Sequence, residues 1–373
     1  MSIYGEAEFI FASIKIITIL GLLIAGLVIM LGGAPDKDRR GFRYWKEGAM
    51  KEYVGTGNTG RFTGLWSTLV NAAFSYGGVE MVAVAAGEAA NPRKNIPKAV
   101  KRVFWRILFF YVLGSFVIGT TISSNDPQLT ADGAKGAQKS PWVIAMKNAG
   151  IPVLPHIINA VILTSATSSG NAFLYTGSRY LFGIAQNRQA PQFLLKCNKQ
   201  GVPVYCVAVT ASVSLLTYMS VSSGASKVFA WFQNLVTIAS LFTWCSICYT
   251  YVCFRKAQIA QNVDRNSLIF RSRWQPYTAW AAFVYFALII LFNGFKVFTK
   301  KNWGPDELTD FFTAYIGIAI FALLFIFWKV FKRTKQVNPA EADIWSGKAA
   351  LDAEVWPEQI PRNALEKFWF WLC

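Results

Sequence analysis

The 373-residue sequence has little of the chemistry on which enzymes depend. It contains one histidine, His156, and six cysteines, of which only Cys245 and Cys248 have the spacing of a metal or redox pair. Because no second pair and no neighbouring histidine accompany them, we expect free buried thiols there. No glycine-rich nucleotide loop follows a strand pattern, and no Ser/His/Asp set can be assembled. The sequence therefore predicts a protein that is not an enzyme and that uses no cofactor and no metal.

Acidic residues are also scarce, since 20 Asp and Glu stand against 37 Lys and Arg and the formal net charge is +17. A basic excess of this size can indicate a nucleic-acid partner. Here the basic residues gather in separate loops, and they form no continuous patch with interleaved aromatic residues. We therefore expect no nucleic-acid partner and interpret the charge as a signal of membrane orientation.

Long apolar blocks fill most of the chain. It is 54% hydrophobic and only 15% charged, with a mean hydropathy of +0.34. About 20 apolar residues suffice for a helix to cross roughly 30 Å of hydrocarbon. We expect an all-α polytopic membrane protein with about eight spanning helices. The expected crossings are 11–31, 65–86, 104–122, 151–184, 203–221, 228–253, 277–295 and 311–330.

The basic loops alternate along the chain, at 93–102, 188–199, 255–273 and 329–335. Cytoplasmic loops carry an excess of Lys and Arg, so this side is expected to be cytoplasmic. Residues 1–335 then form the transmembrane region, and residues 336–373 form a cytoplasmic tail. One connection departs from the rule, because it is expected outside but carries several basic residues: Lys37, Arg39, Arg40, Arg43, Lys46 and Lys51.

The second expected crossing contains paired glycines and a carboxylate, in the run Phe74-Ser75-Tyr76-Gly77-Gly78-Val79-Glu80. An ionisable group at membrane depth suggests a functional site. Glycine lowers the cost of unwinding a helix, and discontinuous helices of this kind mark midplane binding sites in secondary transporters. The alternative is a packing notch, in which small residues let two helices approach closely. The glycines and the glutamate occur together, which favours a functional break.

Residues 86–99, AGEAANPRKNIPKA, resemble the G-E-x-x-N-P-R-x-x-x-P-x-A signature of fungal amino acid permeases in the amino acid–polyamine–organocation (APC) superfamily. Further similar segments follow in the family's order at 4–9, 41–45, 168–179, 254–257 and 275–277. The family has twelve helices in two inverted repeats, a fold like that of LeuT, with broken helices one and six facing the substrate. In this comparison Tyr4 aligns with the start of the fifth helix. The resemblance therefore implies helices five to twelve, and a chain that lacks the first four.

The resemblance implies roles for the break, which corresponds to the family's sixth helix. Backbone groups and half-helix ends at Phe74, Ser75, Tyr76, Gly77 and Gly78 would bind the charged groups of an amino acid. Phe74 would cover the bound side chain, although a core aromatic is an equal alternative. Glu80 would take and release a proton and couple transport to a proton gradient. Its alternative is a neutral, hydrogen-bonded structural glutamate.

Four polar residues recur at three- and four-residue steps in the crossing 151–184, namely Ser165, Ser168, Asn171 and Tyr175. They share one face of a helix, which either lines the solute path or bonds a neighbouring helix. We favour the path, as substrate-binding groups, for Ser168 and Asn171, and helix packing for Tyr175. Further gating or structural residues are expected at the following positions: Glu88, Asn91, Arg93, Arg179 and Asn234.

The resulting hypothesis is a secondary active amino acid permease, with proton symport, as a multi-pass protein of the plasma membrane. Its partners would be an amino acid, protons and membrane lipid. Two alternatives are a permease for choline, polyamine or another cationic metabolite, and a non-transporting amino acid sensor that keeps the permease fold.

Overall fold

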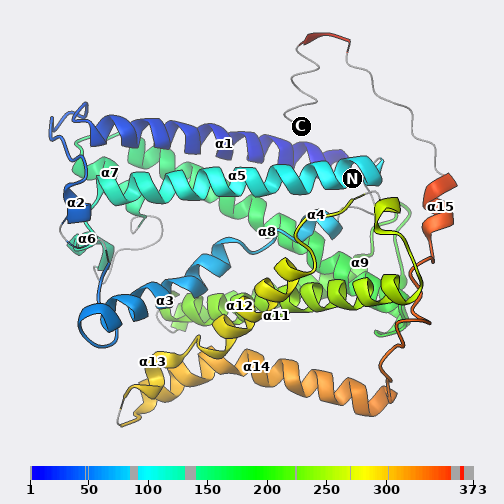
Figure 1. Ribbon diagram of the computed structural model, residues 1–373. Coiled ribbons are helices and arrows are strands. Elements are labelled where there is room, and N and C mark those ends of the chain that lie inside the picture. Colours follow the sequence, from blue (N-terminus) through cyan, green and yellow to red (C-terminus); the bar gives the residue numbers. More distant parts are fainter. Residues whose placement is uncertain are drawn as a thin grey trace. The chain divides into compact units, whose positions relative to one another are not determined.

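The computed structural model describes residues 2–46, 48, 50–84, 91–130, 140–222, 225–268, 270–300, 302–353 and 362–364 (Figure 1). This part of the chain contains helices and turns and no β-strand. The α-helices are α1 (Ser2–Met30), α2 (Arg43–Lys46), α3 (Gly57–Ser75), α4 (Met81–Val84), α5 (Pro92–Thr121), α6 (Pro127–Thr130), α7 (Pro141–Asn148), α8 (Leu154–Gln186), α9 (Val204–Val213), α10 (Met219–Ser222), α11 (Ala225–Ala260), α12 (Tyr277–Leu291), α13 (Phe295–Phe298), α14 (Pro305–Lys332) and α15 (Lys348–Ala353). Short 3₁₀ helices are η3 (Gln192–Leu195), η4 (Ser214–Tyr218) and η5 (Arg265–Ser267).

Five of the described helices are long and apolar enough to cross a membrane. They are Gly5–Met30 within α1, all of α5 and α8, Val228–Ala260 within α11, and α14. The three other expected crossings are shorter or interrupted. Of the crossing expected at 65–86, the described residues 65–84 divide between α3 and α4. Residues 203–221 run through α9, η4 and α10, and α12 has only 15 residues. The prediction of an all-α polytopic membrane protein is confirmed, and five of the eight expected crossings are single long apolar helices within the described residues.

The chain forms two compact units. Unit 1 comprises the described residues within 1–72, 78–84 and 100–233, and unit 2 those within 73–77, 85–99 and 234–373. The chain therefore passes from unit 2 to unit 1 between Gly77 and Gly78, the two glycines of the expected break.

In unit 1, α1, α7 and α8 pack around a shared apolar core. Leu22 and Ile29 of α1 meet Met146 of α7 and Ile158 of α8, and all four are buried. The α5 helix runs beside α1 (Figure 1), where Gly26 faces Val117. A Cβ atom on Gly26 would lie 2.1 Å from the Val117 Cγ1 atom, so glycine permits the close approach of these two helices.

Replacing Gly26 by leucine is expected to destabilise unit 1 by about 2 kcal/mol, because an added side chain must force α1 away from α5. The measurement is the unfolding of the purified chain in detergent. Gly21→Leu is the matched control on the same helix, since no atom lies within 4 Å of the position that its Cβ would occupy. Equal losses in the two variants would mean that this packing contact is unimportant.

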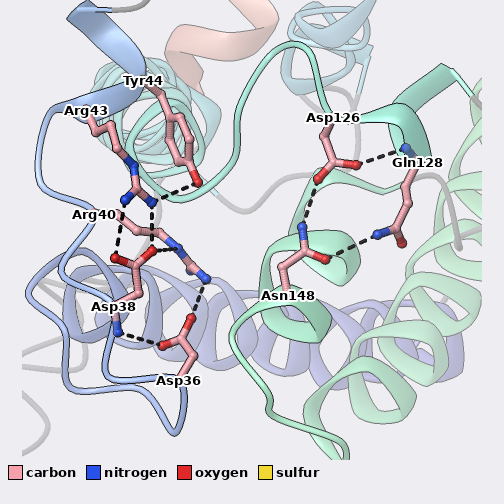
Figure 2. A network of polar contacts seen from close by, with 8 residues as sticks. All are labelled: Asp36, Asp38, Arg40, Arg43, Tyr44, Asp126, Gln128 and Asn148. Atoms are coloured by element: carbon pink, nitrogen blue, oxygen red, sulfur yellow. Dashed lines mark hydrogen bonds and ion pairs between the residues drawn. The ribbon is translucent and has the colours of Figure 1, made fainter.

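In the loop after α1, two of the six basic residues that depart from the orientation rule are paired with carboxylates. Arg40 donates a hydrogen bond to Asp36 at 2.6 Å, and Arg43 donates two to Asp38 at 2.7 and 3.3 Å (Figure 2). The hydrogen bonds from Arg43 hold the pKa of the Asp38 carboxyl below its ordinary value, so this partner stays charged at neutral pH. The carboxylates offset the two arginines within the loop itself.

Figure 2 also shows two hydrogen bonds that connect the segment after α5 to the end of α7. The Asn148 side chain donates to Asp126 at 2.8 Å and accepts from Gln128 at 3.2 Å. It therefore ties the start of α6 to the last residue of α7.

In unit 2, α11 and α14 pack side by side. The rings of Phe242 and Phe321 stack with centroids 4.1 Å apart, and Gly317 lies against Ile238. These contacts advance by four residues along both helices, so α11 and α14 run parallel and their basic C-terminal ends lie on the same side.

Candidate functional site

The helix break predicted between residues 74 and 80 is present. The α3 helix ends at Ser75, residues 76–80 form turns, and α4 begins at Met81. The backbone N–H of Gly77 donates to the carbonyl of Phe74 at 3.1 Å, and that of Met81 to the carbonyl of Gly78 at 3.0 Å. Gly78 has a φ of +90°, which glycine adopts readily and other residues rarely do. The paired glycines thus permit the break.

Glu80 is half-buried at the end of the break and directly precedes α4, which packs against α8 in unit 1. Phe74, in the last turn of α3, is 37% exposed, as are many large apolar side chains of this structure.

The polar face of α8 turns towards α1, where it meets two charged residues. The hydroxyl of Ser168 accepts a hydrogen bond from Lys15 Nζ and donates one to Glu8 Oε2, both at 2.8 Å. Asn171 donates to the other Glu8 oxygen at 3.5 Å. Ser168 is 1% exposed, so its one hydroxyl joins opposite charges in a buried position. The structure thus brings together Ser168 and Asn171, and it places them in a polar contact between helices.

A cavity of about 580 Å³ lies beside these groups, between α1, α5 and α8. Lys15 and Ser165 supply polar groups to its lining, and most of the remainder is apolar, including Leu22, Phe110 and Ile158. The cavity is open on one side, and its mostly apolar lining with a few polar groups is a property that it shares with small-molecule sites. The ammonium of Lys15 is therefore placed between a cavity and a buried hydroxyl.

Glu8 and Lys15 were not expected as site residues from the sequence. The sequence does contain a signal for them, because both are ionisable within an apolar run and stand seven residues apart, on the same face of a helix.

Two further polar residues were also missed. Gln233 donates to the Asn71 side chain at 2.9 Å and links the start of α11 to α3, whereas its predicted neighbour Asn234 is half-buried on α11.

Two of the expected gating or structural residues, Asn91 and Arg179, make local contacts within the protein. Asn91 has a positive φ of 45° and its carbonyl accepts from Lys94 and Asn95, so it opens α5, with Pro92 as the first helical residue. Arg179 lies over the ring of Tyr175 at 5.4 Å. Glu88 lies outside the described residues.

Arg93 contacts the C-terminal segment. In unit 2 it forms an ion pair with Asp352 of α15, and Asp352 also accepts from Lys348 at 2.7 Å. The Gln261 side chain after α11 donates to the carbonyls of Pro339 and Ala342, at 3.2 and 2.7 Å. The described part of the tail is therefore held at two points.

Asp352→Asn is expected to release the segment around α15, because both cations lose their carboxylate partner. Lys348 first and Arg93 second lower the pKa of Asp352. Its contribution is therefore complete above the unfolded pKa of about 3.9 and disappears as the pH falls through the lowered folded value. Amide hydrogen exchange at neutral pH should rise around residue 350 in this variant, and not in Glu341→Gln, which alters an exposed tail carboxylate. Unchanged exchange in Asp352→Asn would show that the ion pair does not hold the tail.

The fold and these groups together define a polytopic membrane protein with a broken helix and buried polar contacts between its helices. Comparison with known proteins gives the family. The model of the amino acid permease family matches residues 1–338. The chain is 44% identical to a probable proline-specific permease of Schizosaccharomyces pombe and 43% identical to a proline-specific permease of Emericella nidulans. Each of these alignments covers 99% of this chain and 68% of the relative.

A lysine-specific permease of Saccharomyces cerevisiae is 38% identical over 99% of this chain and 60% of its own length. The chain thus spans about two thirds of the length of these relatives. It belongs to the amino acid permease family, and its function is the transport of amino acids across a membrane.

Proposed function

We propose that the chain carries out secondary active, proton-coupled transport, with the amino acid bound at the break around residues 74–80. The observation that carries this proposal is the interruption between α3 and α4 inside an apolar crossing. Unwound backbone exposes amide and carbonyl groups, and half-helix ends carry partial charges that suit a zwitterion. Phe74, Ser75, Tyr76 and Gly77 lead into the break, and Gly78 turns the chain. Binding and transport involve no bond chemistry, so the protein is not an enzyme.

We further propose a small neutral amino acid, proline, as the substrate. Two relatives with 43 and 44% identity are described as proline-specific, whereas the lysine-specific relative has 38%. Glu80 is the only ionisable carboxylate in the run from Phe74 to Glu80, and it is assigned to the proton here. The run therefore contains no second carboxylate that could pair with the side chain of a cationic amino acid, which favours a neutral substrate.

Radiolabelled proline binding to the purified chain, with unlabelled lysine, glutamate and choline as competitors, tests this assignment. Displacement by proline alone supports a neutral substrate. Displacement by choline or lysine in preference would point instead to a permease for cationic compounds. Absence of any proline binding to a folded chain would contradict the proposal.

Glu80→Gln is expected to abolish proline uptake driven by an inward proton gradient while leaving equilibrium binding largely intact. A glutamine keeps the shape and hydrogen bonding of a protonated carboxyl but cannot release a proton. The assay compares gradient-driven uptake and binding in vesicles containing the chain. Glu80→Asp is the matched control, because it keeps an ionisable group and should retain part of the uptake. Normal gradient-driven uptake by Glu80→Gln would exclude Glu80 as the coupling group.

We also propose that the protein lies in the plasma membrane, with residues 1–335 as the transmembrane region and the tail from residue 336 in the cytoplasm. The parallel α11 and α14 helices support this orientation, since both end in basic residues on one side. Protease protection of an epitope after residue 336 in sealed vesicles of known orientation would test it.

A further inference from the structure

The loop between α11 and α12 contains a small basic hollow that the transport function does not use. The hollow has a volume of about 280 Å³ and is lined by Arg265, Arg271, Ser272 and Arg273. All of these residues belong to unit 2. Asp264 is the one acidic residue of the described loop 261–276, and it accepts a hydrogen bond from the backbone N–H of Asn266. The loop therefore concentrates positive charge around one point.

Two of the three arginines are positioned by the loop itself. The Arg265 guanidinium donates to the carbonyls of Ser272 and, at 3.4 Å, of Gln275, and Arg271 donates to the Asn266 side chain. A guanidinium has five N–H donors, so these bonds leave others for a ligand. Within the described part of the chain, none of the three arginines forms an ion pair with a carboxylate. Three like charges around one hollow repel one another, and a bound anion would offset that repulsion.

The surroundings of the hollow indicate which anion it suits. The loop connects the spanning helix α11 to the apolar helix α12, so it lies at a membrane surface. Phe270 and Trp274 flank the arginines and are 48 and 71% exposed, and Tyr277 at the start of α12 is 78% exposed. Exposed aromatic side chains beside basic residues are favoured at the headgroup level of a bilayer. A dissolved anion would make no use of them.

We propose that Arg265, Arg271 and Arg273 bind the phosphate headgroup of an anionic phospholipid, with Phe270 and Trp274 anchored among the neighbouring lipids. Guanidinium groups form paired hydrogen bonds with phosphate oxygens, and three of them suit a phosphate monoester that carries more than one negative charge. The occupant is a lipid of the leaflet that this loop faces. The site goes beyond the proposed transport function, because it contains none of the residues assigned to substrate or proton.

The test is binding of dioctanoyl phosphatidic acid to the purified full chain in neutral detergent, measured by native mass spectrometry and titration. Arg271→Gln with Arg273→Gln should weaken binding by about 30-fold, and Arg273→Gln alone by about fivefold, since each basic residue near a charged lipid surface is worth about 1 kcal/mol. Lys196→Gln with Lys199→Gln is the matched control. It removes two exposed charges from another basic loop and should leave the affinity unchanged.

Two further probes identify the source of the phosphate. Dioctanoyl phosphatidylcholine should bind much more weakly than phosphatidic acid, because its headgroup has no net charge. Inorganic phosphate should compete only at far higher concentration, because it lacks the acyl chains.

Equal affinity for inorganic phosphate and phosphatidic acid would overturn the lipid assignment in favour of a free anion. Equal loss of binding in the Lys196/Lys199 control would overturn the site, and so would unchanged binding in the arginine variants. Proline binding by the arginine variants should stay normal, which separates this proposal from the transport function.

Discussion

Replacing Gly78 by valine is expected to reduce amino acid binding and uptake at least about tenfold. Gly78 has a φ of +90°, and a β-branched residue in that conformation costs about 1–3 kcal/mol. A steric clash is not the cause of this effect, because a Cβ at Gly78 would only be in van der Waals contact with the Met81 side chain at 3.5 Å. Valine instead disfavours the turn itself, so the chain between Ser75 and Met81 shifts towards conformations in which the break has a different shape. The measurement is proline binding to the purified chain, together with uptake in vesicles.

Gly183→Val is the matched control for this prediction. Gly183 lies within α8, its φ is not positive, and no atom lies within 4 Å of the position that its Cβ would occupy. Valine should be tolerated there at a cost of about 0.5 kcal/mol or less. A Gly78→Val variant with normal binding would show that the special backbone conformation of Gly78 is not needed for the site.

Lys15→Met is expected to lower the free energy of unfolding by about 3 kcal/mol, the second large effect. Lys15 shares the Ser168 hydroxyl with Glu8 at 2.8 Å on each side, and Ser168 is buried. Removing the ammonium leaves the Glu8 carboxylate between helices without an opposite charge, and an uncompensated charge in such a position is strongly destabilising. The measurement is unfolding of the purified chain in detergent.

A double-mutant cycle separates the missing partner from the missing side chain. Glu8→Gln with Lys15→Met removes both charges, and it should recover much of the loss, because no unpaired ion remains. Ser168→Ala, which removes only the bridging hydroxyl, should cost less than Lys15→Met. If the double variant were less stable than Lys15→Met alone, the two charges would not act through one another.

The break shows how far local sequence can predict a site. Two adjacent glycines beside a glutamate, inside an apolar run, are enough to indicate an interrupted membrane helix, and α3 and α4 are separated at that point. The start of α5 could also be predicted from neighbouring residues, since Asn91 and Pro92 supply a turn and a first helical residue. These features depend on backbone preferences of a few neighbouring residues, which act wherever the segment lies.

For the polar face of α8, local sequence predicts the face but not the groups that it contacts. The spacing of Ser168 and Asn171 places both on one side of the helix, but it leaves open whether that side lines a path or meets a helix. The structure has Glu8 and Lys15 of α1 at that face, more than 150 residues away in sequence. The same holds for the contact of Arg93 with Asp352 and for the bond between Gln233 and Asn71.

Contiguous residues were therefore enough to predict the class of protein, the family resemblance, the membrane helices and the position of the break. Apolar length, glycine placement and short motifs are properties of contiguous residues, and solvation in a membrane acts on each segment separately. The folded chain was needed to show which charges pair, where the tail is held and how three arginines surround one hollow. Those contacts join residues that are distant in sequence or turned together by a loop, and their energies depend on distances that packing alone sets.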